Sequence, residues 1–207
     1  MRIFSPILYS CLTMPNWYSG NVTIRGDISR FRKWYLKHKD TEEGLENSFA
    51  QTFAPLSSGK WDFGTACDEW GVKWDLGNIS MISGEDEDDE EFSFSFDTAW
   101  NAPVRLWRQL ELRYEVEVEE YGYEEQQIEF YKYHKGRFIC KEIDNDWFAE
   151  NLNFEPSEEA KHDEELMEDE KNDFKYDYWC DGMELCHKQL TEDDELWKDV
   201  DLDFEIE

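Results

Sequence analysis

Alternation of apolar and polar residues marks the segments of this chain that are expected to form β-strands. The clearest case is FSFSFDTAW, in which Phe92, Phe94 and Phe96 share one face and two serines occupy the other. A period of two residues is typical of a half-buried strand. The segments with strand patterns are 17–25, 70–83, 92–100, 113–122 and a hairpin within 126–143 that turns near Lys135-Gly136.

Apolar spacing of three and four residues predicts two helices. The first covers residues 27–40, with Asp27 as the expected N-cap, and the second covers 102–110, with Pro103 in its first turn. Residues 40–69 show no clear period and are expected to be irregular. The helix residues expected to face the core are Ile28, Phe31, Tyr35, Leu36, Val104, Trp107 and Leu110.

The order strand, helix, strand, strand, helix, strand, followed by extra strands, predicts an α+β fold. The arrangement is that of a ferredoxin-like split βαβ sandwich, an antiparallel sheet with helices on one face. Beyond Asn145 the pattern becomes acidic and mainly helical, with a capped helix starting near Pro156-Ser157. We therefore expect an N-terminal extension (1–13), an α+β domain (14–142) and an acidic C-terminal appendage (143–207) that docks on the domain.

Charge separates the two halves of the chain. The net charge is −30, yet residues 1–83 hold 9 basic and 9 acidic residues. Residues 84–142 hold 7 basic and 17 acidic residues, and residues 143–207 hold 5 and 25. The imbalance begins at seven consecutive acids, Glu85 to Glu91. Such charge repels nucleic acid and anionic membranes, so it predicts a basic partner.

Composition limits the remaining classes. Aromatic residues make up 16% of the chain, which argues against wholesale disorder. Five cysteines without CxxC spacing predict neither a disulfide framework nor a zinc knuckle, and favour a reducing cytoplasm. The cluster Cys180, Cys186 and His187 lacks a fourth ligand. Residues 1–13 imitate a signal sequence but lack a cleavage site, and no segment approaches the length of a membrane span, so a soluble cytoplasmic protein is expected.

No pattern of catalytic residues stands out. The chain has no GxSxG, P-loop or GxGxxG motif, and surplus surface acids cannot single out a catalytic carboxylate pair. The acidic block also lacks the central glycine and the regular spacing of oxygen ligands found in a calcium-binding EF-hand loop. We expect no enzyme activity, no cofactor and no dedicated metal site.

Three motifs resemble a known family. MPNWYSGNVTIRGD from Met14, WGVKWD from Trp70 and FSFSFDTAWNAP from Phe92 are similar to the YubB-type ferredoxin-like domain family of phages and plasmids. The resemblance covers residues 14 to about 140, although Asn101-Ala102-Pro103 stands where the family usually has Ser-Pro-Pro. It implies the fold, a mobile-element origin and Met14 as the usual start. It implies no reaction, and the acidic block and residues 143–207 lie outside the family pattern.

Rows of carboxylates suggest nucleic-acid mimicry. Alternate residues of a strand lie about 6.6 Å apart on one face, comparable to successive phosphates, and acids three or four apart stack on a helix. The hypothesis is an inhibitor that presents this surface to a basic nucleic-acid-binding host protein, without binding nucleic acid itself. The expected contact residues are Glu85, Asp86, Glu87, Asp88, Asp89, Glu90, Glu91, Glu115, Glu117, Glu119, Glu158, Asp163, Glu165, Glu168, Asp169, Asp193, Asp194 and Asp199.

Other readings remain open at the level of sequence. The acids could simply keep an aromatic-rich protein in solution. The protein could instead be an adaptor that binds another protein through its aromatic sheet or helices. A third alternative is single-stranded nucleic-acid binding through the basic helix face Arg30–Lys39, which the net charge opposes.

Overall fold

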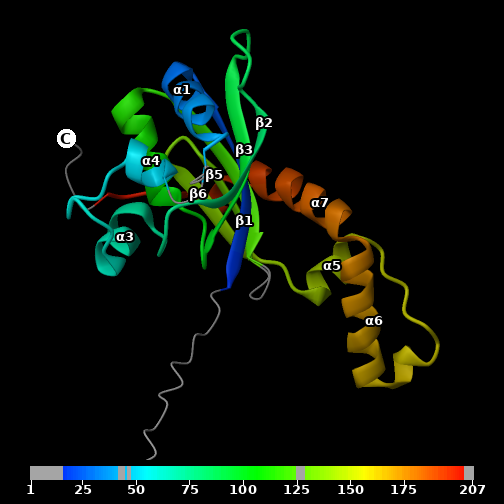
Figure 1. The fold of residues 1–207 in the computed structure, drawn as a ribbon. Helices are drawn as coiled ribbons and strands as arrows, with labels where there is room; N and C mark the ends of the chain where they lie inside the picture. Colours follow the sequence, from blue (N-terminus) through cyan, green and yellow to red (C-terminus); the bar gives the residue numbers. More distant parts are fainter. Residues whose placement is uncertain (1–15, 42–44, 46–47, 125–128, 203–207) are drawn as a thin grey trace, which may run out of the picture.

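One open antiparallel sheet organises the part of the chain that the computed structural model describes, residues 16–41, 45, 48–124 and 129–202 (Figure 1). Across the sheet the strands follow the order β2-β3-β1-β4-β5-β6-β7. The α+β class and the antiparallel sheet are as expected. The strands are β1 Trp17–Arg25, β2 Gly77–Ser83, β3 Glu91–Ala99, β4 Glu117–Glu124, β5 Glu129–His134, β6 Arg137–Glu142 and β7 Lys198–Asp199.

Sequence alternation predicted the buried face of β3, but the strand expected over 70–83 begins only at Gly77 and the one expected over 113–122 begins at Glu117. In β3, the side chains of Phe92, Phe94 and Phe96 are buried on one face, as expected. The β5–β6 hairpin turns at Lys135 and Gly136, whose φ values of 49° and 75° are those of the tight turn that matches strand twist. Both predictions are confirmed.

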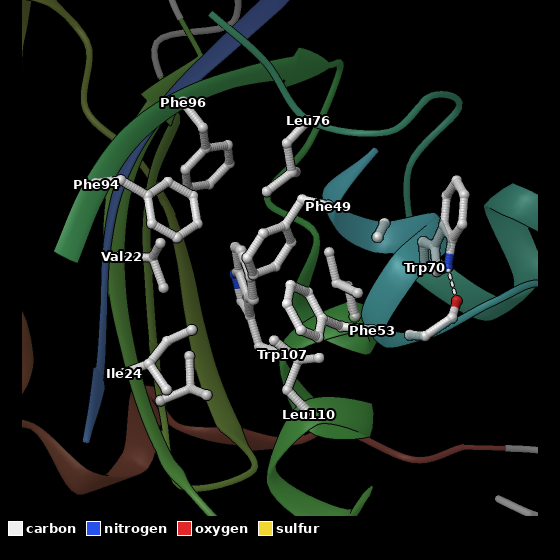
Figure 2. Close-up of a cluster of buried hydrophobic side chains, with 14 of the residues drawn as sticks. Val22, Ile24, Phe49, Phe53, Trp70, Leu76, Phe94, Phe96, Trp107 and Leu110 are labelled. Carbon is white, nitrogen blue, oxygen red and sulfur yellow. Dashed lines mark hydrogen bonds between the residues drawn. The ribbon is translucent and has the colours of Figure 1, made fainter. Parts of the chain in front are cut away.

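Four helices cover the face of the sheet that carries these phenylalanines. They are α1 Ser29–His38, α2 Phe49–Phe53, α3 Phe63–Trp70 and α4 Val104–Tyr114. In the core, the ring of Phe49 lies 5.1 Å from that of Phe94, and the ring of Trp107 lies 5.4 Å from that of Phe96 (Figure 2). The helix side chains therefore interlock with the sheet through aromatic contacts.

The irregular structure expected for residues 40–69 is wrong, because α2 and α3 lie there. Both helices are too short to show a repeating apolar stripe. Hydrogen bonds at their ends mark where they begin and stop. The Asp62 carboxylate accepts a hydrogen bond from the Thr65 backbone N–H at 3.0 Å, and α3 ends at Gly71 with a φ of 84°. For α2, the distant Asp75 carboxylate accepts hydrogen bonds from two backbone N–H groups at its start.

The predicted inward face of the first helix needs one correction. The N-cap is Ile28 rather than the expected Asp27, although the Asp27 carboxylate accepts a hydrogen bond from the Ser29 backbone N–H at 3.1 Å and so satisfies a free N–H at the start of the helix. Leu36, however, is 47% exposed, and Trp34 is buried in its place. The indole of Trp34 packs on Phe49 and Phe53 of α2, an element that the sequence pattern did not predict.

Helices lie on both faces of the sheet, so the expected single helical face is wrong. Helices α5 Asn145–Asn151 and α7 Trp179–Glu192 pack on the opposite face (Figure 1). Their buried side chains meet Phe130 and Ile139 of the β5–β6 hairpin. This second core exists because β5 buries an aromatic ring on each face, Phe130 on one and Tyr131 and Tyr133 on the other, so both faces of the hairpin need cover.

The C-terminal region is helical, as expected, but its long acidic helix begins later than the sequence suggested. Ser157 lies in a turn before the short 3-10 helix Ala160–His162, and α6 runs from Glu164 to Asp177. A second 3-10 turn, Asp194–Leu196, leads into β7, which pairs with β6 in the same sheet. Helix α6 lies beyond the sheet, beside α5 (Figure 1).

A buried acid lies beneath the first helical face. The Tyr18 hydroxyl donates a hydrogen bond to Glu120, and both residues are fully buried. Gly122 makes room for this pair, because a Cβ there would overlap the Tyr18 hydroxyl and the Ser19 carbonyl. The phenol ring of Tyr18 can therefore lie across β4 because Gly122 has no side chain.

We expect Gly122→Ala to lower the free energy of unfolding by about 2 kcal/mol, the usual effect of overpacking a core. Urea unfolding followed by circular dichroism would measure this. The control is Gly64→Ala in α3, where the nearest atom to the new Cβ lies 3.5 Å away, so stability should hold or rise. Wild-type stability for Gly122→Ala would contradict the packing described here.

No helix among the described residues is long and apolar enough to cross a membrane.

Candidate interaction surface

The acidic block between β2 and β3 forms a turn that is held in place by hydrogen bonds. The Asp89 carboxylate accepts hydrogen bonds from the backbone N–H groups of Gly84 and Asp86, at 2.8 and 3.0 Å. The Arg32 guanidinium of α1 donates to the carbonyls of Gly84 and Asp89, at 3.0 and 2.9 Å. The basic face of α1 therefore holds the acidic turn in place.

Both ends of the block are paired with cations. Glu85 accepts hydrogen bonds from Lys39 and from the Tyr35 hydroxyl, which lower the pKa of its carboxyl group. Glu91 forms an ion pair with Arg25 at 3.2 Å. The residues that remain exposed and open to a partner are Asp86, Glu87, Asp88 and Glu90.

The expected carboxylate row of β4 is not a free anionic surface. Glu115 lies outside the strand, as the C-cap of α4 with a φ of 54°. Glu117 forms an ion pair with Lys135 at 2.9 Å. Glu119 accepts from Arg25 at 3.0 Å and from Lys132 at 3.1 Å. Burial alone would raise the pKa of Glu119, but these hydrogen bonds outweigh it and lower the pKa.

Most C-terminal acids that the sequence proposed also have partners. Asp193 accepts from the Glu195 backbone N–H and so caps a 3-10 turn. Asp194 and Asp199 both lie near the Arg137 guanidinium, at 3.2 and 3.9 Å. The Asp194 and Asp199 side chains stay 91% and 83% exposed, so these surface ion pairs are weak and both carboxylates remain within reach of a partner.

Helix α6 carries a row of exposed acids along one side. We call this helix, together with the segment before it, the acidic arm (residues 144–177). Asp163 is the N-cap of α6, accepting from the backbone N–H groups of Glu165 and Leu166. Glu158 pairs with Lys161, and Glu168 accepts from Asn145 at 2.6 Å. Four exposed acids then follow at intervals of four residues: Glu165, Asp169, Asp173 and Asp177.

The cations of the acidic arm do not neutralise that row. The segment holds 14 acids against three lysines. Lys161 pairs with Glu158 and Lys171 pairs with Asp146. Lys175 is largely buried, and desolvation lowers the pKa of its amino group. Residues four apart on a helix are about 6 Å apart along its axis, so α6 presents evenly spaced charges.

Cys186 and His187 both pack against neighbouring side chains, which indicates a structural role for them. The Cys186 thiol is buried in the second core, and burial raises its pKa to about 12. His187 packs against Tyr121 and lies 3.4 Å from the Lys132 amino group, and desolvation lowers the pKa of the imidazole. Within the described residues, no group of three or more potential ligands could hold a metal ion.

Sequence reasoning missed an exposed aromatic surface around α3. A groove of about 460 Å³ lies there. Beside it the Lys73 amino group lies 4.3 Å from the centre of the Trp74 ring and 5.2 Å from that of Trp100. The high tryptophan content was the available signal, but only the fold brings these rings together. The residues that line the groove are Gln51, Gly59, Lys60, Trp61, Trp70, Trp74 and Asp75.

Comparisons with protein-family models, curated proteins and solved structures gave no significant match to this chain.

Proposed function

We propose that this protein is a phage- or plasmid-encoded inhibitor of a host defence protein, a nuclease, restriction enzyme or CRISPR effector. It acts in the cytoplasm by nucleic-acid mimicry, with the acidic arm as the contact surface. The proposal rests on the exposed row Glu165, Asp169, Asp173 and Asp177, whose charges are not offset by the lysines of the same segment.

The proposed mechanism is occlusion without turnover. A groove lined with Lys and Arg would attract the acidic arm over a distance and hold it where phosphates normally bind. Helix α6 is suited to this role because it lies beyond the sheet, where a partner can reach it (Figure 1). Like charges at four-residue spacing destabilise an isolated helix, so a partner that neutralises them would relieve that repulsion.

The proposed fold family is ferredoxin-like, extended by three strands. The elements β1, α1, β2, β3, α4 and β4 occur in the order of a split βαβ unit, and their strands lie in the order β2-β3-β1-β4. Strands β5, β6 and β7 then enlarge the sheet beyond β4. This arrangement supports, as a proposal, the YubB-type origin that the sequence motifs imply.

Salt-dependent capture tests the mimicry. The immobilised protein is loaded with a bacterial lysate and eluted with a salt gradient, and bound proteins are then tested for competition with DNA. We expect a retained nucleic-acid-binding protein whose DNA binding the wild-type chain blocks. An arm variant carrying Glu165→Gln, Asp169→Asn, Asp173→Asn and Asp177→Asn should release it at lower salt, because four screened contacts are lost.

The matched control removes the same number of charges from the acidic turn, through Asp86→Asn, Glu87→Gln, Asp88→Asn and Glu90→Gln. This variant should elute close to the wild type. Equal release by both variants would show that net charge alone decides binding. A captured protein that binds DNA and this chain at the same time would contradict occlusion.

A further inference from the structure

The tryptophan groove beside α3 has the dimensions of a small-molecule site. Its volume of about 460 Å³ lies within the usual range for ligand pockets. Trp61, Trp70 and Trp74 are among its lining residues, although Trp70 is only 1% exposed. The Trp61 side chain is 52% exposed although it is a large apolar group, so one indole surface is open to a ligand.

The rings are held in place before any ligand arrives. The Trp61 indole N–H donates to the Lys73 carbonyl at 3.0 Å, and the Trp70 indole N–H donates to the Ala54 carbonyl at 2.7 Å (Figure 2 shows the second bond). Trp74 packs against Trp17, with ring centres 6.1 Å apart. Fixed rings lose little conformational entropy on binding.

The charge available at the groove is positive. Among the described residues that line the groove, Asp75 is the one acid, and its carboxylate accepts hydrogen bonds from the backbone N–H groups of Ala50, Gln51 and Leu76. Lys60 is exposed at the rim and forms no ion pair within 4 Å among the described residues, although its charge contributes, after the hydrogen bonds from Thr65, to the lowered pKa of the Asp62 carboxyl. Lys73 lies against aromatic rings rather than an acid. A fitting ligand is therefore planar, aromatic and anionic.

We propose that this groove binds a mononucleotide, with the base stacked on the exposed Trp61 indole and the phosphate near Lys60. Base–indole stacking supplies affinity without requiring a particular base. A free nucleotide fits better than a nucleic-acid strand, because the chain carries a net charge of −30 and would repel a longer polyanion. The groove is separate from the acidic arm: α3 and α6 lie at opposite sides of the molecule (Figure 1).

Titration with thymidine 5′-monophosphate tests the proposal, with thymidine and a short oligothymidylate as comparisons. Calorimetry should show saturable binding of the monophosphate, and weaker binding of thymidine, which lacks the phosphate. Trp61→Ala should weaken monophosphate binding at least about fivefold through lost stacking. Lys60→Ala, at an exposed position, should remove the preference for the monophosphate over thymidine.

Trp100→Ala is the matched control, because Trp100 is exposed nearby but does not line the groove. It should leave monophosphate affinity close to that of the wild type, and circular dichroism would establish that each variant is folded. Absence of saturable binding, or equal affinity in wild type and folded Trp61→Ala, would overturn the proposal. Binding of the oligothymidylate more than about tenfold tighter than the monophosphate would also overturn it, by indicating a strand-binding surface.

Discussion

Trp107→Ala is expected to lower the free energy of unfolding by about 3–5 kcal/mol, the range for truncating a buried tryptophan. Trp107 is fully buried at the centre of the first core, where it meets Phe49 of α2 and Phe96 of β3 (Figure 2). Its loss would leave a cavity that rigid aromatic neighbours cannot fill. Chemical denaturation of the purified variant would measure the change.

Trp61→Ala is the control for this prediction, since it makes the same substitution at a half-exposed indole. Its effect should stay well below that of Trp107→Ala, because little apolar area is buried there. Equal destabilisation by the two variants would mean that Trp107 does not occupy the centre of the core.

The second large effect is a pH dependence of the free energy of unfolding that arises from the buried Glu120. Burial raises the pKa of Glu120 to about 8, although the hydrogen bond from Tyr18 and the charge of Lys132 oppose the rise. The folded protein therefore holds a proton on Glu120 that the unfolded chain releases near the ordinary glutamate pKa. Protonated Glu120 therefore makes its full contribution to the free energy of unfolding below the unfolded-state pKa of 4.5. This contribution is lost as the pH rises through the folded-state pKa of about 8.

We expect wild-type stability, relative to Glu120→Gln, to fall by roughly 4 kcal/mol between about pH 4.5 and pH 8.5. The glutamine variant cannot ionise, so it should be the more stable protein at the alkaline end. Urea unfolding of both proteins at matched pH values would show this. Parallel stability curves would contradict a buried, protonated Glu120.

The buried acid was not visible in the sequence pattern. Glu119 and Glu120 are adjacent and look alike, yet Glu119 has a lowered pKa and Glu120 a raised one. Alternate residues of β4 point to opposite faces of the sheet. Glu119 meets Arg25 and Lys132, whereas Glu120 meets Tyr18 in the core. The local pattern showed that the two glutamates lie on opposite faces of β4, but it could not show which residues each of them contacts.

The same limit applies to the acidic surface. Sequence spacing predicted rows of carboxylates as if each were free. In the fold, Arg25 reaches Glu119 across 94 residues of chain, and Arg137 reaches Asp194 across 57. Such pairs depend on strands brought together by the sheet, so no local period reveals them. The acids of α6 remained open because the nearby lysines are already occupied or buried.

By itself the sequence indicated strands β1 to β6 without their exact bounds, the buried face of β3, two of the helices and the change from a neutral to an acidic chain. These features follow from side-chain periods of two and about 3.6 residues, and from composition, all of which are local. The tertiary structure alone decided which acids are neutralised, that helices cover both faces, and that three tryptophans form one groove. Ion pairing, desolvation and ring packing depend on distances between residues far apart in the chain, and only the folded sheet sets those distances.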